Sequence, residues 1–328
     1  MNDRRLQLAR FGAVMAAPLL FPLAARAQEP YPNKPVKLVV PFGAGGSADM
    51  LARVIAEGLT NSLKRTVIVE NRPGATGTIG ATYVTRAEPD GYTLLLAFDG
   101  TVAIAPAIQA NFPFDPLKDL APVSKLADVD LVIVVNPSVP ARNIRELVQY
   151  GKANPGKLSY ASPGLGSTAQ MAGELLRVKA GLDWVHVPYA SGSGKFVLDV
   201  IGGSVPAAFI SVAVAAPFIA DRKLVGVGIP SAQRNRAIPD VPTFRESGLA
   251  GFDAASWFGL SAPAATPRDV IDRLNREVHA VLANPATAKR LQDAGLNPST
   301  TTPPEFAALI RSDLVKWGEV ARQAQIKS

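Results

Sequence analysis

The chain has 328 residues, of which 34 are basic and 27 acidic, with no cysteine and a formal net charge of +7. Residues 1–27 hold four of the arginines and one aspartate, so the remainder carries only +4, without a basic run interleaved with aromatics. This composition excludes disulfide bonds and lacks the electrostatic signature of a nucleic-acid-binding protein.

The N-terminus has the three parts of a secretory signal. Its arginines, including the pair Arg4 and Arg5, precede an apolar stretch (residues 11–23), and Ala25 and Ala27 are the small residues that signal peptidase reads. We predict cleavage after Ala27 and a periplasmic product, with Sec and twin-arginine export both open. Neither this stretch nor any later one reaches the ~18 apolar residues of a membrane span.

From residue 36 onward, short apolar runs alternate with helical patterns. The predicted strands are 36–41, 66–70, 93–97, 131–136, 157–161, 184–187, 207–211 and 224–229. The predicted helices between them are 48–59, 143–153, 168–179 and 195–201. This alternation predicts an α/β fold built from βαβ units, with mainly parallel sheets flanked by helices.

The pattern changes near the C-terminus, where three helices (268–282, 285–294 and 303–325) follow one another and no strand is predicted. A helical tail of this kind packs back onto a sheet formed earlier in the chain. We therefore predict two lobes, the first from residues 28–128 plus 255–328 and the second from residues 129–254. Two crossings between the lobes would form a hinge beside a cleft.

The sharpest local motif joins the first predicted strand to the first helix. Gly43, Gly45 and Gly46 allow a tight turn with close backbone approach, and Ser47 and Asp49 suit the start of a helix. Unpaired N–H groups and the positive end of the helix dipole favour an anion at such a corner. The alternatives are a structural turn that binds nothing and a dinucleotide fold.

The dinucleotide alternative rests on spacing. Residues 43–48 satisfy G-x-G-x-x-A, and Glu70 ends the next predicted strand 27 residues after Gly43. Three observations count against an NAD-binding oxidoreductase: export to a compartment without a nicotinamide pool, the interruption of the strand by Pro41, and a second glycine-rich segment at 74–80. We expect no cofactor.

Other loops at strand ends offer further N–H and hydroxyl donors. They contain Gly164, Gly166, Ser167 and Thr168 after one strand, Tyr189, Ala190 and Ser191 after another, and Phe209, Ser211, Asp99 and Thr101 at two more. Ligands of open α/β sheets bind at the carboxyl ends of strands. Together these loops predict one binding crevice.

Catalytic patterns are scarce. The two histidines, His186 and His279, are remote from each other, and neither H-E-x-x-H nor G-x-S-x-G occurs. We predict no catalytic residue and no metal site. A secreted hydrolase using Ser47 or Ser167 is the alternative, and the lack of a histidine near any glycine-rich loop in the sequence disfavours it.

With these segments placed, the chain resembles the Bug/TctC-type family, the extracytoplasmic solute receptors of tripartite tricarboxylate transport systems. The motifs that carry the resemblance span most of the mature chain: residues 31–35, 41–53, 69–74, 89–95, 114–119, 156–162, 172–175, 186–189, 239–243 and 256–260.

The resemblance implies a two-lobed Venus-flytrap receptor, periplasmic and usually monomeric, that closes on a carboxylate and presents it to a membrane transporter or a signalling partner. It implies a pocket lined by the turn at 42–47 with Asp49, the loop at 164–168 and the region around Tyr189, with Phe42 near the ligand. In this family backbone amides and bridging waters hold the ligand carboxylate.

The sequence departs from the family at three positions. Gln170 stands where histidine is common, Ala190 where lysine or arginine is common, and Pro206 where aspartate is common. The loss of a cation beside the pocket argues against a highly charged ligand such as citrate. We therefore hypothesise a monocarboxylate, or a small aromatic or amide-bearing acid.

Overall fold

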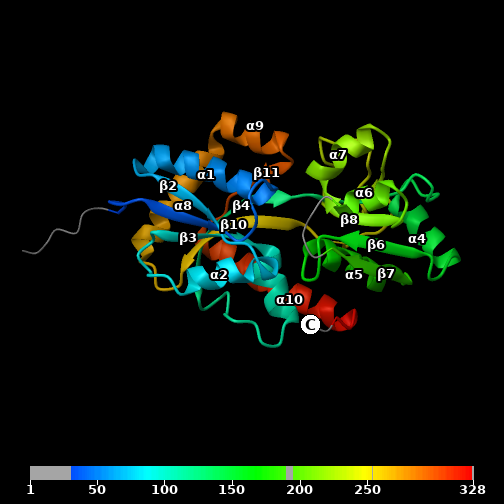
Figure 1. Cartoon of the computed structure of the whole chain (residues 1–328), viewed down its shortest axis with the longest axis horizontal. Coiled ribbons are helices and arrows are strands. Elements are labelled where there is room, and N and C mark those ends of the chain that lie inside the picture. The colour runs from blue at the N-terminus through cyan, green and yellow to red at the C-terminus, as the bar shows by residue number, and fades with distance from the viewer. Residues whose placement is uncertain (1–30, 190–194, 253, 327–328) are drawn as a thin grey trace, which may run out of the picture. The chain divides into compact units, whose positions relative to one another are not determined.

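The computed structural model describes residues 31–189, 195–252 and 254–326. The predicted signal and cleavage site, as well as Ala190 and Ser191, lie outside these ranges. The described strands form two sheets flanked by helices (Figure 1). Within the described ranges, no helix is both long and apolar enough to cross a bilayer.

The first sheet has six strands in the order β11-β4-β10-β3-β1-β2. The strands are β1 (Val36–Val40), β2 (Val67–Asn71), β3 (Thr93–Phe98), β4 (Leu120–Val129), β10 (Ser256–Pro263) and β11 (Leu296–Pro298). β1 is parallel to β2 and β3, whereas β10 is antiparallel to β3 and β4, and β11 is antiparallel to β4. Its flanking helices are α1 (Ser47–Leu63), α2 (Thr78–Thr85), α8 (Arg268–Ala283), α9 (Pro285–Asp293) and α10 (Pro303–Gln323).

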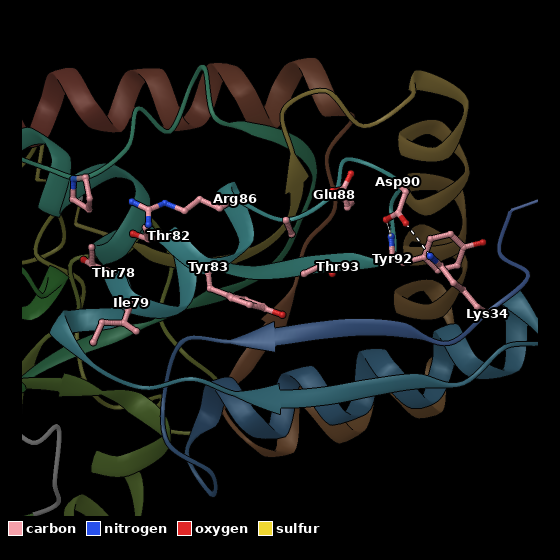
Figure 2. A pocket seen from close by; sticks show the side chains of 12 residues that line it. Lys34, Thr78, Ile79, Thr82, Tyr83, Arg86, Glu88, Asp90, Tyr92 and Thr93 are labelled. Atoms are coloured by element: carbon pink, nitrogen blue, oxygen red, sulfur yellow. Dashed lines mark hydrogen bonds and ion pairs between the residues drawn. The ribbon is translucent and has the colours of Figure 1, made fainter.

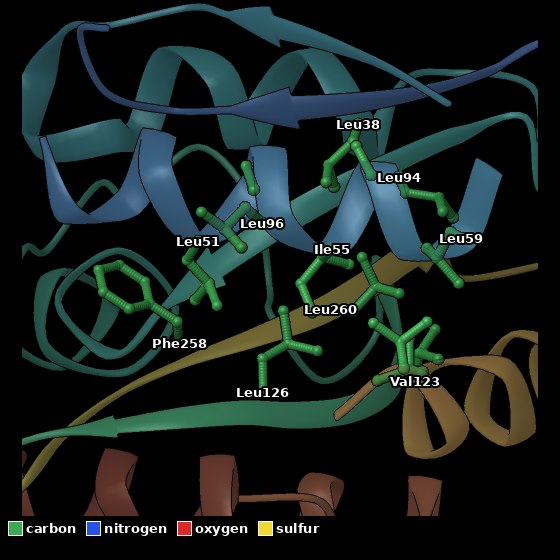
Figure 3. Close-up of a cluster of buried hydrophobic side chains, with 14 of the residues drawn as sticks. Leu38, Leu51, Ile55, Leu59, Leu94, Leu96, Val123, Leu126, Phe258 and Leu260 are labelled. Carbon is green, nitrogen blue, oxygen red and sulfur yellow. The ribbon is translucent and has the colours of Figure 1, made fainter. Parts of the chain in front are cut away.

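Helices cover both faces of this sheet, so consecutive residues of the interior strand β1 are buried. Leu38 of β1 lies in a cluster with Ile55 of α1 (Figure 3). Val39 points to the opposite face, into a cluster with Phe306 of α10. A strand buried on both faces needs apolar side chains on both, which is why Leu38, Val39 and Val40 follow one another in β1, whereas Lys37 near its start is only half-buried.

The second sheet has five strands in the order β7-β6-β8-β5-β9. They are β5 (Leu131–Val135), β6 (Leu158–Ser162), β7 (Trp184–Pro188), β8 (Ala207–Ser211) and β9 (Val225–Gly228). β6 is parallel to β7 and β8, and β5 is antiparallel to β8 and β9. Its helices are α4 (Ile144–Ala153), α5 (Thr168–Ala180), α6 (Lys195–Ile201) and α7 (Val212–Ala220).

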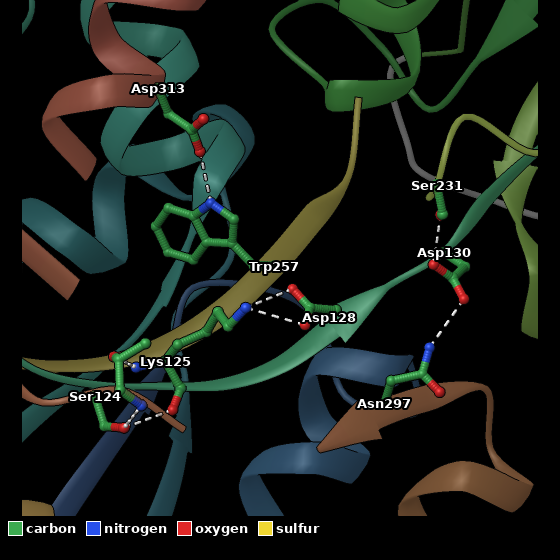
Figure 4. Close-up of polar contacts among 9 residues, drawn as sticks. Ser124, Lys125, Asp128, Asp130, Ser231, Trp257, Asn297 and Asp313 are labelled. Atoms are coloured by element: carbon green, nitrogen blue, oxygen red, sulfur yellow. Dashed lines mark hydrogen bonds and ion pairs between the residues drawn. The ribbon is translucent and has the colours of Figure 1, made fainter. Parts of the chain in front are cut away.

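The chain passes from the first sheet to the second between β4 and β5, which Asp130 alone separates. The Asp130 carboxylate accepts hydrogen bonds from Ser231 Oγ at 2.6 Å and Asn297 Nδ2 at 2.9 Å (Figure 4). It also accepts one from Asn235 Nδ2 at 2.7 Å. Asn297 belongs to β11 of the first sheet, whereas Ser231 and Asn235 follow β9 of the second. One carboxylate thus ties segments of both sheets together at the crossing.

The C-terminal helix α10 contributes to the cores on both sides of this crossing. Phe306 and Ile310, near its start, pack in the cluster that contains Leu95 of β3. Trp317, near its end, is fully buried in the cluster that contains Leu176 of α5. The helix therefore couples the packing of the two sheets.

The two-sheet α/β architecture is confirmed, and each of the eight predicted strands appears within one residue of its predicted bounds. Strands β4, β10 and β11 were not predicted, and the expectation that strands stop after residue 267 is wrong. β4 carries Pro122 and Lys125, and β10 carries Gly259, so neither reads as an apolar run. Their antiparallel pairing makes the first sheet mixed rather than mainly parallel.

Candidate functional site

The corner between β1 and α1, residues 42–47, is open; we call it the first corner. Gly43 to Ser47 are exposed, and a Cβ added at Gly43, Gly45 or Gly46 would meet nothing within 4 Å. Gly45 has φ +90°, a conformation that favours glycine. No side chain caps this 17-residue helix at Gly46, so its first N–H groups donate no hydrogen bond to a capping residue.

Asp49 supports this corner from within. It is 4% exposed and accepts hydrogen bonds from the Gly45 amide at 3.0 Å, from Arg53 Nε at 2.9 Å and from Asn71 Nδ2 at 3.0 Å. Asn71 Nδ2 also donates to the Phe42 carbonyl at 3.0 Å. The Arg53 guanidinium lowers the pKa of Asp49, so this carboxylate is charged and already occupied. Asp49 therefore shapes the turn rather than offering a free ligand contact.

The corner between β6 and α5, residues 164–168, is closed by its own side chains; we call it the second corner. Ser167 Oγ donates to the Gly164 carbonyl at 2.7 Å and accepts from the Gln170 amide at 3.2 Å. Gln170 Oε1 accepts from the Gly166 amide at 2.7 Å. The Gln170 side chain thus stabilises the loop from within, and Ser167 caps the start of α5.

Asp99 connects the end of β3 to the second corner. Its carboxylate accepts hydrogen bonds from Thr168 Oγ1 at 2.7 Å, Ser256 Oγ at 2.9 Å and the Gly100 amide at 2.9 Å. The side chain has no exposed surface, and burial raises the pKa of Asp99 to about 7. Asp99 therefore joins β3, β10 and α5 through buried hydrogen bonds.

A second bridge runs beside it. Thr101 Oγ1 donates to the Thr76 carbonyl at 2.8 Å, and Thr76 Oγ1 donates to the Leu165 carbonyl at 3.4 Å. Thr101 is fully buried, whereas Leu165 is 64% exposed. The segment after β2 thus touches the second corner directly.

Three further predicted site residues lie apart from these contacts. Tyr189 is half-buried, and its hydroxyl donates to Asp199 Oδ2 at 2.6 Å. Phe209 has no exposed surface and packs against Tyr160. Ser211 is half-buried at the start of α7. The prediction of Phe209 as a ligand contact is corrected, because its side chain points into the core.

Sequence reasoning missed four residues that the structure brings to this region: Asn71, Thr76, Phe98 and Ser256. The Phe98 ring contacts Phe42 edge-on, with centroids 5.3 Å apart, and so joins β3 to the first corner. Asn71 ends a strand just before a glycine turn, which is a usable signal. Ser256 lies on a strand that the sequence did not reveal, so nothing local indicated its role.

The structure corrects the argument that no histidine lies near a glycine-rich loop. His186 Nε2 is 2.6 Å from Ser162 Oγ, directly before the second corner. Ser162 is fully buried and also bonds with Gly164 at 3.2 Å, so its hydroxyl is not presented to a substrate. Neither Ser47 nor Ser167 has a histidine partner in the described chain, where no cluster of metal-ligating residues occurs either.

His186 makes the stability of the protein sensitive to acid. Burial lowers its pKa from 6.5 to about 4, so its contribution to stability is complete above pH 6.5 and is lost as the pH falls towards 4. In His186→Gln, we expect the loss of unfolding free energy between pH 7 and 4.5 to be smaller by on the order of 2 kcal/mol. Urea unfolding at both pH values measures it.

Val185→Gln, which changes an exposed neighbour on the same strand, should keep the wild-type acid response. An unchanged response in His186→Gln would show that another group controls it.

A wide groove of about 930 Å³ lies elsewhere, along α2 and the loop before β3 (Figure 2). Arg86 extends along α2 past Thr82, and Tyr83 lines the same surface. Lys34 and Asp90 at its far end pair with each other at 3.0 Å. Although this groove is wide, the first corner is the better candidate for the binding site, because the uncapped start of a helix lies there.

Comparisons with known proteins agree with this architecture. The family described as Tripartite tricarboxylate transporter family receptor matches residues 51–326. Protein BugT of Bordetella pertussis is 35% identical over 329 aligned positions, covering 100% of this chain and 99% of that protein.

Two solved structures carry carboxylates. A Rhodopseudomonas palustris protein with adipate has a TM-score of 0.82 and 31% identity, covering 90% of this chain and 99% of that one. MatC from the same organism, with bound malate, has a TM-score of 0.78 and 31% identity, covering 88% and 99%. The chain therefore belongs to the receptor family of the tripartite tricarboxylate transporters, a family of periplasmic binding proteins.

Proposed function

We propose that the protein is an exported receptor that captures a small carboxylate at the first corner and presents it to the membrane subunits of a transporter. The observation that carries this proposal is the uncapped, exposed start of α1, where the glycines leave room for a ligand. Helix N-termini bind anions through free N–H groups and the helix dipole. The relatives solved with adipate and malate support a carboxylate as the anion.

In this proposal the ligand lies between two lobes, residues 28–128 plus 255–328 and residues 129–254, and the chain acts as a monomer after cleavage behind Ala27. Asp130 stands at the crossing and holds segments of both sheets. Closure around the ligand is the signal that the membrane partner reads, because a ligand favours the conformation to which it binds more tightly. The protein binds and releases its ligand without chemical change.

The predicted site residues take different roles in this proposal. Direct contacts come from the exposed or half-buried groups Phe42, Ser47 and Tyr189 and from the amides of the first corner. To these the structure adds the exposed side chain of Leu165. Support comes from buried groups that hold the loops: Asp49, Asp99, Thr101, Ser167, Thr168 and Gln170. Ala190 and Ser191, the remaining predicted contacts of that loop, lie outside the described residues.

Ser47→Asp tests the first corner. The new carboxylate would occupy the anion site at the start of α1, where it also suits the helix dipole, so ligand binding should be lost while the fold persists. Thermal unfolding with mono-, di- and tricarboxylates measures binding, since a ligand at 100 times its dissociation constant adds ~2.7 kcal/mol. We expect a shift with at least one carboxylate for wild type and none for Ser47→Asp.

Ser47→Ala is the matched control, because it removes the hydroxyl without adding charge and should keep most of the shift. An equal shift in Ser47→Asp would mean that the ligand binds elsewhere. A wild-type melting curve that no carboxylate moves would contradict the proposed function.

A further inference from the structure

The two corners differ in how many hydrogen-bond donors they leave available for a ligand. At the first corner no side chain caps α1, and the acid beside it, Asp49, is neutralised by its ion pair with Arg53 at 2.9 Å. At the second corner Ser167 and Gln170 already satisfy loop and helix amides. The first corner can therefore accept an anion, whereas the second has few donors left.

The second corner also holds a carboxylate of its own. Asp99 bonds with Thr168, the first residue of α5, and with Ser256 and the Gly100 amide, but with no lysine, arginine or histidine among the described residues. The ionisable group that acts on Asp99 in the described chain is another acid, Asp313 of α10, which pairs with Lys316 at 2.9 Å and accepts from Trp257 Nε1 at 2.7 Å. The charge of Asp99 is thus stabilised by neutral donors alone.

Two segments that meet at the second corner carry exposed apolar side chains. Leu165 of the second corner is 64% exposed, and Ile79 at the start of α2 is 57% exposed. Thr76 links the two segments through its bond to the Leu165 carbonyl. Phe42 and Phe98 form an edge-on pair at the first corner. Residues 162–168 contain no lysine or arginine that could compensate a second ligand charge.

Resting on the proposed function, we infer that Asp99 determines the charge class of the ligand. Its buried carboxylate repels a second anionic group at the second corner, so the protein selects an acid with one carboxylate and an uncharged tail. The carboxylate binds at the first corner, and the tail lies against Leu165. Like charges in a partly buried site interact strongly because little water screens them. Asp99 acts without touching the ligand.

The test uses pairs of ligands of equal length, each an α,ω-dicarboxylate and its monoamide, from four to eight carbons. Dissociation constants are measured at pH 8 for wild type, Asp99→Asn and Asp293→Asn. The last variant removes an exposed acid from α9 and controls for net charge. Wild type and Asp293→Asn should bind the monoamide at least about 10-fold more tightly, and Asp99→Asn should bring the pair within about 3-fold.

A second measurement needs only the wild-type protein. Because burial places the pKa of Asp99 at about 7, its carboxylate is mostly charged at pH 8.5 and mostly neutral at pH 6. Acids with an ω-sulfonate keep their far charge across this range. The ratio of the dissociation constant of each sulfonate to that of the matching ω-amide should therefore fall about 10-fold or more from pH 8.5 to pH 6.

The outcomes separate the inference from the function on which it rests. Dicarboxylates that bind wild type as tightly as their monoamides, with no gain in Asp99→Asn and no pH effect, would overturn the role of Asp99 alone. Absence of binding for both members of every pair would overturn the proposed function and this inference with it. Preference for the monoamide that persists in Asp99→Asn and at pH 6 would assign selectivity to another group.

Discussion

Gly259→Ala should lower the free energy of unfolding by roughly 2–4 kcal/mol. Gly259 is fully buried in β10, between Ala97 of β3 and Lys125 of β4. A Cβ at this position would lie 2.1 Å from Phe306 Cζ and 2.7 Å from Cε1. Phe306 is itself fully buried and packs edge-on against Trp257, so the ring has no space into which it could retreat.

Chemical denaturation followed by circular dichroism measures this loss as a shift in midpoint. Gly43→Ala is the matched control for stability, because an added Cβ there meets nothing and the backbone is not in a glycine-only conformation. The control should remain within about 0.5 kcal/mol of wild type. If Gly259→Ala were equally mild, the packing of α10 against β10 would be looser than described.

Trp317→Ala should cost about 3–5 kcal/mol, in the range measured for buried aromatic residues. Trp317 has no exposed surface and lies with Ile104 and Leu176 in the core beside the second sheet. Its loss would leave a cavity that rigid neighbours on α5 and α10 cannot fill. Because α10 starts in the core of the first sheet, the substitution should weaken the packing of both sheets.

The control for this prediction lies on the same helix. Val315 is 70% exposed, so Val315→Ala should leave stability within about 0.5 kcal/mol of wild type. Denaturant midpoints of both variants provide the comparison. Equal stability of the two variants would show that the end of α10 is not packed in the core.

Both positions lie on elements that also support the buried carboxylate of Asp99. β10, which carries Gly259, also carries Ser256, a donor to Asp99. The adjacent Trp257 bonds with Asp313 of α10 at 2.7 Å (Figure 4). Substitutions that loosen α10 should therefore disturb the hydrogen bonds of Asp99 as well as the core. Binding assays of such variants therefore need a stability measurement alongside.

Much of the secondary structure could be predicted from sequence because both sheets are covered by helices. Strands such as residues 131–135 consist of apolar residues throughout, and the helices between them have one apolar face. β4 and β10 escaped prediction because Lys125 and Gly259 interrupt them, and their burial comes from partners more than 100 residues away. The mixed pairing of the first sheet follows from these two strands.

For the site, the glycines and Ser47 could be identified from the strand–turn–helix pattern alone. Whether each corner is open or closed by its own side chains could not be predicted. Whether a helix start is open or capped depends on where side chains such as Gln170 point. A serine stands at both starts, Ser47 as the first residue of α1 and Ser167 directly before α5, yet only α5 is capped. His186 and Ser162 are 24 residues apart, so their contact at 2.6 Å also had no local signal.

The sequence by itself determined the alternation of strands and helices and the glycine corner that begins α1, and it predicts the export signal, because each depends on neighbours within a few residues. Only the tertiary structure decided that Asp99 lies at the start of α5, that Phe209 faces the core and that Asp130 binds both sheets. These features depend on groups that folding brings together from distant parts of the chain, and a buried charge acquires its meaning from those partners.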